Sequence, residues 1–308
     1  MNIADTMFNV KIGINPISWM NDDLPSLGGE TPLETALAEG AEIGYAGFEL
    51  GNKFPKEAGA LRAVLGKHRL ECVSGWYSGR LAHRSVTQEI EAVGPHLRLL
   101  ADSGATVMVY GEVADAIQGE ALPLYKRPRF SDAAQWRAYA DRLSAFARHT
   151  LAHGVRLSYH HHMGAYVETA EDVDRLMALT APEVGLLFDS GHITFAGGDP
   201  LAVLRQHIGR VTHVHCKDVR PAVARLARNG NWSFLQAVVN GVFTVPGDGG
   251  IDFKSLLELL YQHGYHGWLV VEAEQDPAVA PSYRYAQMGY RHMARLVEEI
   301  EQAGRVAA

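Results

Sequence analysis

The chain has 308 residues, 47% hydrophobic and 20% charged, with a formal net charge of −7, so it has enough apolar material for a large core and lacks the basic stripe of a nucleic-acid binder. No apolar run approaches the roughly 18 residues that a membrane-spanning helix needs, and the first residues, MNIADTMFNVK, contain no apolar signal-peptide core. Because Cys72 and Cys216 are the only cysteines, a disulfide framework is excluded, and we expect a cytoplasmic protein with reduced thiols.

Eight short apolar runs rich in Val, Ile and Leu recur along the chain and predict β-strands, and most are separated by segments with helical spacing of apolar residues. In chain order, the predicted strands are Lys11–Ser18, Ala46–Leu50, Glu71–Trp76, Thr106–Tyr110, Arg156–His161, Val184–Asp189, Val211–Cys216 and Trp268–Glu272. The predicted helices between them include Pro32–Ile43, Val86–Ala101, Asp132–Ala152 and Thr169–Leu179.

This alternation indicates parallel strands joined by helical crossovers, in either a doubly wound sheet or a closed barrel. The first strand runs into Trp19 and Met20 without the Gly-rich phosphate loop of a doubly wound fold. Eight such units with polar residues at the strand ends favour the closed barrel, so the predicted fold is an α/β protein of the (β/α)8 TIM-barrel type. We expect residues 1–308 to form a single domain, with an insertion at about 219–250 between strands seven and eight that carries a helix around Trp232–Val239.

Histidine and carboxylate side chains follow several of these strands directly. Catalytic groups of a (β/α)8 barrel come from the C-terminal strand ends, so these side chains should meet at one mouth. They are Glu49 after strand two, His160 to His162 after strand five, Asp189 and His192 after strand six, His215 and Lys217 after strand seven, and Glu272 and Glu274 after strand eight.

The alternation of side chains along a strand sorts the seventh-strand residues further. His213, His215 and Lys217 share one face, whereas Cys216 points to the other. We therefore expect Cys216 to pack beneath a helix and to take no part in chemistry.

Asp189, His215 and Glu272 stand at the ends of three different strands and form a mixed nitrogen and oxygen ligand set. Such a set suits Mn²⁺, Co²⁺, Fe²⁺ or Zn²⁺ better than Mg²⁺ or Ca²⁺, and it leaves open positions for two substrate oxygens. Each residue alone is also explained by a hydrogen bond or a helix cap, but their combination favours a shared metal site.

The residues resemble those of the xylose-isomerase-like barrel superfamily, which includes sugar isomerases and epimerases, inosose dehydratases and endonuclease IV. The resemblance spans nearly the whole chain and rests on Asp189-x-x-His192, His215-x-Lys217-Asp218, Val245-Pro-Gly-x-Gly249 and the strand ending at Glu272. It implies that Asp189, His215 and Glu272 hold a metal ion. His160 falls where the epimerase branch has a fourth metal ligand, a glutamate. The resemblance therefore implies that His160 either binds the metal or contacts the substrate.

Three further motifs are similar to the inosose dehydratase branch: Tyr159-His-His-His-Met-Gly164, Asn231-Trp-Ser-Phe-Leu with Val242-Phe-x-x-Pro-Gly, and Val270-Val-Glu-Ala-Glu-Gln-Asp-Pro277. This resemblance implies a hydro-lyase of inositol catabolism that converts 2-keto-myo-inositol to a trihydroxycyclohexane-1,2-dione. It also implies a cobalt or manganese requirement and a dependence on glutathione, for which the chain shows no residue signature.

The expected roles follow from this reaction. Glu272 or a fifth-strand histidine would remove the proton beside the ketone, and His192 or His162 would protonate the departing hydroxyl. Lys217 would bind a substrate oxygen or form a salt bridge with Asp218 or another carboxylate. Substrate contacts are expected from Glu49, Trp76, His160 and Glu274, whereas Trp19 either faces the substrate ring or packs in the core.

Three alternatives remain at this stage. A sugar or ketose isomerase or epimerase would use the same barrel without loss of water, but His160 replaces the glutamate that paired acid–base epimerisation needs. An apurinic endonuclease would need a basic surface and further metal ligands, and a non-catalytic barrel would leave the acid and base groups unexplained. The expected partner is a small polyhydroxylated ketone, with neither nucleic acid nor membrane, and the chain could pair with copies of itself.

Overall fold

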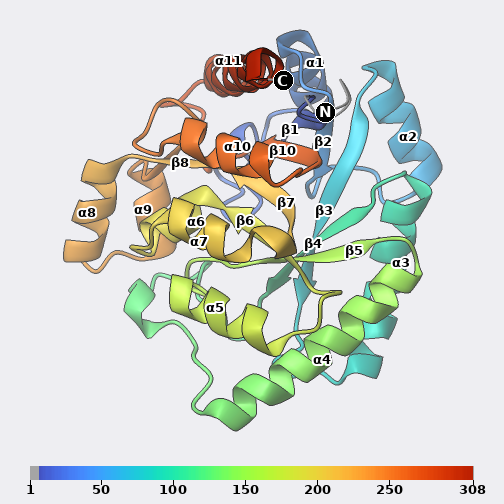
Figure 1. Cartoon of the computed structure of the whole chain (residues 1–308), viewed down its shortest axis with the longest axis vertical. Coiled ribbons are helices and arrows are strands. Elements are labelled where there is room, and N and C mark those ends of the chain that lie inside the picture. Colours follow the sequence, from blue (N-terminus) through green and yellow to red (C-terminus); the bar gives the residue numbers. More distant parts are fainter. Residues whose placement is uncertain (1–6, 308) are drawn as a thin grey trace.

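The computed structural model describes residues 7–307, and these contain a closed barrel of eight parallel strands surrounded by helices (Figure 1). The strands lie side by side in the order β1 (Val10–Ile14), β2 (Gly47–Leu50), β3 (Glu71–Gly79), β4 (Val107–Glu112), β5 (Arg156–His160), β6 (Gly185–Asp189), β7 (Val211–Cys216) and β10 (Gly267–Val271), which pairs with β1. The predicted (β/α)8 TIM barrel is therefore confirmed. Residues 1–6, part of the segment in which we expected no signal peptide, lie outside the described residues.

The helices cover the outside of the barrel, and the longest, α11, lies beside α1 (Figure 1). They are α1 (Leu33–Ile43), α2 (Ala58–Lys67), α3 (Val86–Asp102), α4 (Ala133–Ala152), α5 (Ala170–Leu179), α6 (Ser190–Phe195), α7 (Pro200–His207), α10 (Phe253–Gln262) and α11 (Ser282–Ala307). Strands covered by helices outside and filled by side chains inside are apolar on both faces, which is why β6 is buried along its whole length.

The first strand is shorter than predicted, because β1 ends at Ile14 and a 3-10 turn over Pro16–Ser18 follows it. Pro16 has no backbone N–H to donate to a neighbouring strand. Asn15 caps the turn with its side-chain oxygen, which accepts a hydrogen bond from the Ile17 N–H at 3.0 Å. The prediction that the strand reaches Ser18 was wrong, and the turn brings Asn15 and Ile17 to the mouth of the barrel.

Between β7 and β10 the chain forms β8 (Asp218–Val219), α8 (Pro221–Asn229), α9 (Phe234–Val239) and β9 (Phe243–Thr244) before α10. Helices α8 and α9 lie together at one side of the barrel (Figure 1) and have a small apolar core of their own that includes Phe234 and Phe243. Asp218 anchors the turn that follows β9, because its carboxylate accepts the backbone N–H groups of Gly247, Gly249 and Ile251 at 3.0–3.1 Å.

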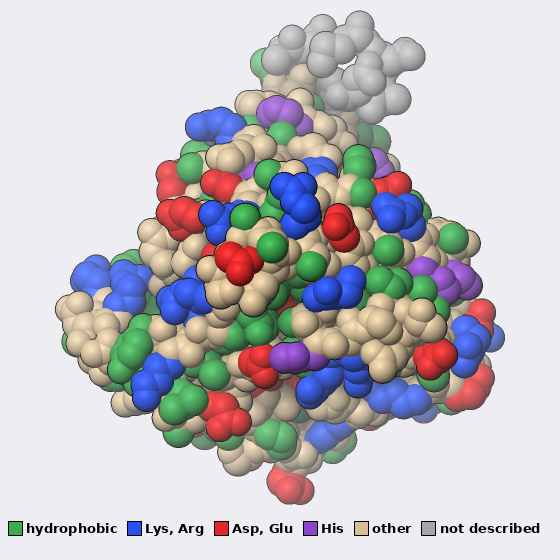
Figure 2. Space-filling view, turned by 90° about the horizontal axis from the view of Figure 1, so that it is seen from below, with side chains coloured by type: hydrophobic (Ala, Val, Ile, Leu, Met, Phe, Trp, Pro, Cys, Tyr) green, Lys and Arg blue, Asp and Glu red, His purple; other side chains and the backbone are tan. Residues whose placement is uncertain are grey.

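Within residues 7–307, no helix combines the length and the apolar composition that crossing a membrane requires. Figure 2 shows lysine and arginine side chains interspersed with acidic ones over the face that it displays.

Candidate functional site

A cavity of about 230 Å³ opens at the C-terminal ends of the barrel strands. It is slightly smaller than the roughly 300–1,000 Å³ of pockets that hold drug-sized ligands, so it suits a small molecule. Polar side chains from different strand ends and loops line it. Those that the sequence predicted as site residues are Trp76, His160, His162, His192, Glu272 and Glu274.

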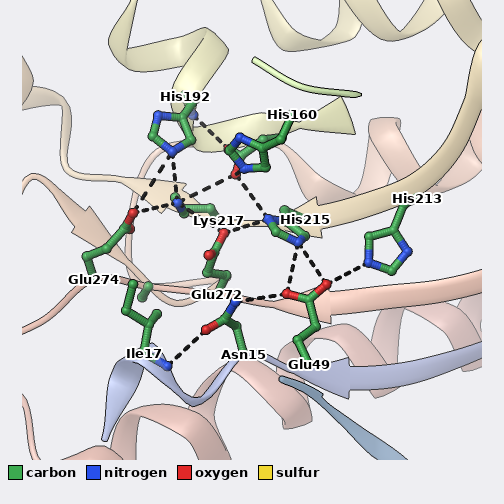
Figure 3. Close-up of polar contacts among 12 residues, drawn as sticks. Asn15, Ile17, Glu49, His160, His192, His213, His215, Lys217, Glu272 and Glu274 are labelled. Atoms are coloured by element: carbon green, nitrogen blue, oxygen red, sulfur yellow. Dashed lines mark hydrogen bonds and ion pairs between the residues drawn. The ribbon is translucent and has the colours of Figure 1, made fainter. Parts of the chain in front are cut away.

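Four of the predicted residues meet beside this cavity, one from each of β5 and β6, one from β7, and one directly after β10. The ligand atoms of His160, Asp189, His215 and Glu272 all lie within 4.8 Å of one another, and all four residues are buried. Figure 3 shows three of them, His160, His215 and Glu272, close together. His215 Nδ1 lies 2.7 Å from Glu272 Oε2 and 3.5 Å from Asp189 Oδ2, and His160 Nε2 lies 3.4 Å from the same Asp189 oxygen. We call these four residues the four-residue cluster.

Several atoms of the four-residue cluster fit a divalent metal ion better than they fit one another. Among the described residues, Asp189 Oδ2, His215 Nδ1 and Glu272 Oε2 are fully buried and have no hydrogen-bond partner. Buried polar atoms without hydrogen bonds are costly, and native structures usually satisfy them with protein, water or a metal ion. The buried cluster is therefore consistent with a divalent metal, held by two imidazoles and two carboxylates.

Glu49 determines which nitrogen of His215 faces the four-residue cluster. A Glu49 carboxylate oxygen lies 3.1 Å from His215 Nε2, and an ionised carboxylate only accepts hydrogen bonds. Nε2 therefore donates its hydrogen to Glu49, and Nδ1, which lies on the side of Asp189 and Glu272, is the nitrogen that a metal ion would bind in place of a proton. A carboxylate behind a ligating histidine is a common way to fix its ring and increase its basicity.

The structure thus gives Glu49 a different position from the one that a substrate contact needs. Its carboxylate also accepts hydrogen bonds from Ser74 Oγ at 2.6 Å, Asn15 Nδ2 at 2.8 Å and His213 Nε2 at 2.8 Å. With these partners and 2% exposure, Glu49 lies beneath the cavity and not in its wall.

Charges in the site keep both carboxylates of the four-residue cluster ionised. Burial raises the pKa of Asp189, but Lys217 and His192 hold it well below its usual value. Burial likewise raises the pKa of Glu272, but His215 and Lys217 lower it to about 2. Both side chains therefore keep their negative charge over the whole physiological pH range.

Lys217 connects the four-residue cluster to a second group of polar residues. Its ammonium is fully buried and lies 3.0 Å from Glu272 Oε2, 2.9 Å from Glu274 Oε1 and 3.1 Å from His192 Nε2 (Figure 3). A Cβ added to Gly191 would lie 2.5 Å from Lys217 Cγ, so only glycine at this position leaves room for the lysine stem. The expected salt bridge of Lys217 to Asp218 or another carboxylate is therefore confirmed with Glu272 and Glu274, and not with Asp218, which anchors the insertion.

The second group consists of His162, His192 and Glu274, whose ligand-type atoms also lie within 4.8 Å of one another. His162 Nδ1 lies 2.8 Å from the Met163 carbonyl oxygen, which can only accept, so Nδ1 carries the hydrogen. Burial lowers the pKa of His162 to about 3. The neutral ring therefore presents an unprotonated Nε2 that can accept a hydrogen bond or a proton. Burial raises the pKa of Glu274 to about 7, against the effect of Lys217.

Aromatic rings from the insertion cover this second group. Phe234 lies 5.0 Å from the ring of His162 and stacks at 6.0 Å on His192, and Phe243 lies 5.3 Å from His192. Phe234 belongs to the motif Asn231–Leu235, and Phe243 belongs to the motif Val242–Gly247. The sequence analysis assigned no role to either ring. They exclude water and so strengthen the electrostatic interactions of Lys217.

The structure places one of the two tryptophans singled out in the sequence at the cavity, and it places the other tryptophan and Cys216 in the core. Trp76 lines the cavity, with its ring 5.5 Å from that of His160, whereas Trp19 is 1% exposed and packs against Phe48 in the core. Cys216 is buried in the main apolar core, as expected.

Sequence reasoning missed several residues of the cavity wall, because most follow no strand end: they lie on loops, in the 3-10 turn or on α3, and only Leu50 and Ser78 belong to strands. The missed residues are Asn15, Ile17, Asp22, Asp23, Leu50, Gly51, Asn52, Lys56, Ser78, His96 and Gln118. The available signal was the position of Asn15, which follows β1 as the other polar residues follow their strands.

Residues 37–299 match the family described as Xylose isomerase-like TIM barrel. The chain is 53% identical to "Rhizopine catabolism protein MocC" of Rhizobium meliloti over 293 residues, which cover 95% of this chain and 90% of the relative. It is 46% identical to "Inosose dehydratase" of Geobacillus thermodenitrificans (strain NG80-2) over 280 residues, or 90% and 94% of the two chains.

Solved structures share the fold at low sequence identity. L-ribulose 3-epimerase superposes with a TM-score of 0.67 at 16% identity, over 97% of this chain and 98% of that one. The probable 3-DHS dehydratase AsbF of Bacillus anthracis also gives a TM-score of 0.67, at 14% identity, over 92% of this chain and 99% of that one. At these identities the likeness concerns the fold alone.

Proposed function

The chain belongs to the Xylose isomerase-like TIM barrel family, and from this premise we propose that it is a metal-dependent hydro-lyase that removes water from 2-keto-myo-inositol to give a trihydroxycyclohexane-1,2-dione. The observation that carries the proposal is the pairing of two groups at one cavity. The four-residue cluster suits a metal ion, and the group of His162, His192 and Glu274 beside it supplies proton donors and acceptors.

In this proposal His160, Asp189, His215 and Glu272 hold a divalent ion, Mn²⁺ or Co²⁺. The bound ion would polarise the ketone of the substrate and favour the build-up of negative charge on its oxygen. His160 acts as a fourth ligand, since its Nε2 faces Asp189.

The protein residues carry the protons. His162 Nε2 takes the proton from the carbon next to the ketone, because its lone pair is unprotonated and its ring lines the cavity. Glu274 gives a proton to the departing β-hydroxyl, because its buried Oε2 has no hydrogen-bond partner among the described residues and its pKa is raised to about 7 by burial. One proton and one hydroxide leave the substrate, and the enol that remains rearranges to the dione.

Lys217 and His192 position this chemistry. The Lys217 ammonium lies between the carboxylates of Glu272 and Glu274, so it balances the negative charge on both sides of the cavity. His192 lies 3.1 Å from the lysine nitrogen and stacks on Phe234. Substrate contacts are assigned to Trp76, which supplies an apolar wall for the ring.

The test is an assay with metal-stripped protein, 2-keto-myo-inositol and added Mn²⁺ or Co²⁺, with the product followed by absorbance and mass. We expect a metal-dependent loss of one water that is abolished in Glu272→Gln and Asp189→Asn. Interconversion of ketoses without loss of water would instead assign the protein to sugar isomerisation. Because the chain is also 53% identical to a rhizopine catabolism protein, ketones derived from rhizopine belong in the same panel.

A further inference from the structure

The loop between the 3-10 turn and α1 carries an aspartate that the predicted chemistry does not use. Asp23 lines the same cavity as Glu272 and His162. Its backbone is held by the buried Asn21, whose side-chain oxygen accepts the N–H groups of Asp23 and Leu24 at 2.9 Å each. The position of Asp23 is therefore fixed by the fold before a ligand binds.

The two adjacent aspartates of this loop differ in what they contact. Asp22 accepts the backbone N–H of Asn52 at 2.9 Å and so connects this loop to the loop after β2. The half-buried Asp23 carboxylate lines the cavity together with Gln118 and lies within the electrostatic reach of Lys217 and Glu272. It therefore has acceptor capacity left that faces the cavity.

The chemistry of this carboxylate identifies what it can bind. An ionised carboxylate only accepts hydrogen bonds and has two oxygens, so it suits two adjacent hydroxyl groups of a polyol. A hydrogen bond to a charged group is stronger than one between neutral groups. When the matching hydroxyl is missing, the half-buried carboxylate keeps an unpaired oxygen, and the analogue binds less well.

We propose that Asp23, held by Asn21, is a specificity-determining residue that accepts hydrogen bonds from ring hydroxyls of the substrate outside the four-residue cluster. This inference rests on the proposed function, since it names the part of the chain that recognises the polyhydroxylated ring of the ketone. Removal of the matching hydroxyl, or of the Asp23 carboxylate, costs about 10- to 100-fold in kcat/KM and in affinity.

The experiment compares 2-keto-myo-inositol with a series of analogues that each lack one hydroxyl. Metal-loaded wild type, Asp23→Ala and Asp23→Asn are assayed for kcat/KM, and binding of each compound is measured by calorimetry. Glu30→Gln, an exposed substitution on the same loop, is the control. Equal metal content and equal melting temperatures show that the variants are intact.

We expect wild type and Glu30→Gln to discriminate about 10- to 100-fold against one or two of the analogues. In Asp23→Ala this discrimination falls to within about threefold, and at the other hydroxyl positions the preferences of wild type persist; Asp23→Asn, which keeps one acceptor oxygen, lies between. Dehydration by wild type with an unchanged pattern of discrimination in Asp23→Ala would overturn the inference and leave the proposed function intact. Absence of dehydration by wild type would overturn the proposed function, and the inference with it.

Discussion

Two regions of the barrel bury carboxylates in opposite ways. Around β3 and β4, Glu89 accepts hydrogen bonds from Tyr77 Oη at 2.5 Å and from the Arg80 N–H at 3.3 Å. In the same region, Glu112 accepts hydrogen bonds from Tyr110 Oη at 2.9 Å and from the backbone of Ala82 and Ala114 at 3.0–3.1 Å.

Around β6 and β10 the pattern is reversed, since Asp189, Glu272 and Glu274 each keep a buried oxygen without a hydrogen bond. The difference separates structure from function. Carboxylates whose oxygens accept hydrogen bonds from the protein hold loops in place, whereas those with a buried oxygen that faces only charged or imidazole groups are placed for a ligand. The β3–β4 region thus supports the fold, and the β6–β10 region supports the chemistry.

The largest contrast is expected between Asp189→Asn and Glu112→Gln. Asp189→Asn alters a proposed metal ligand. Mutation of residues that only hydrogen-bond to a metal ligand costs about 10- to 100-fold in metal affinity, so the loss of a ligand should cost more. We therefore expect more than a 100-fold loss in Mn²⁺ or Co²⁺ affinity with a folded protein. Glu112→Gln should keep its metal affinity, because Glu112 lies outside the four-residue cluster. Metal content after gel filtration and calorimetric titration check both, and normal metal binding by Asp189→Asn would remove the distinction between the regions.

The pH dependence of stability is the next largest effect. Burial raises the pKa of Glu112 to about 7 in the folded chain, from 4.5 for the exposed group. The folded state then binds the proton more tightly, so the stabilisation is complete below pH 4.5 and is lost as the pH rises through 7. We expect wild type to lose up to about 3 kcal/mol relative to Glu112→Gln across this window. Urea unfolding at several pH values measures the difference, and parallel curves would contradict it.

A smaller effect is expected from Glu49, which lies behind the four-residue cluster. Glu49→Gln weakens the interaction with His215 and His213, and we expect about a 10- to 100-fold loss in metal affinity. Glu71→Gln is the control, because Glu71 is exposed on β3 and pairs with Lys11 at the surface. Equal metal affinity in the two variants would show that Glu49 does not position His215.

The smallest predicted change concerns the β3–β4 region alone. Tyr77→Phe removes the hydroxyl that donates to buried Glu89, and we expect a loss of about 1–3 kcal/mol in the free energy of unfolding with unchanged kcat/KM. The exposed Tyr125→Phe should change stability by less than about 0.5 kcal/mol. A loss of activity in Tyr77→Phe without a loss of stability would place this tyrosine in the functional region instead.

Much of this arrangement could be predicted from local patterns. The alternation of apolar runs and helical segments predicted the eight strands, and the period of two along β7 predicted that His215 and Lys217 share a face while Cys216 packs in the core. The convergence of Asp189, His215 and Glu272 followed from the rule that barrel strand ends meet at one mouth.

The remaining features depend on contacts between segments far apart in the sequence. The hydrogen bond between Glu49 and His213 joins residues 164 positions apart, so no local pattern could show that Glu49 points away from the cavity. Helix α8 was not predicted at all. The roles of Phe234 and Asp23 depend on how the insertion and the first loop fold over the mouth, which strand periodicity does not describe.

The measurement that tests the account most directly is the reaction of 2-keto-myo-inositol with metal-loaded protein in deuterated water, followed by mass spectrometry. If His162 acts as the base and Glu274 as the acid for the departing hydroxyl, the product has lost one water. The variants His162→Ala and Glu274→Gln should then be strongly impaired. Recovery of a ketone that has lost no water but has exchanged one hydrogen for deuterium would show proton exchange without elimination. This result would contradict the dehydratase assignment.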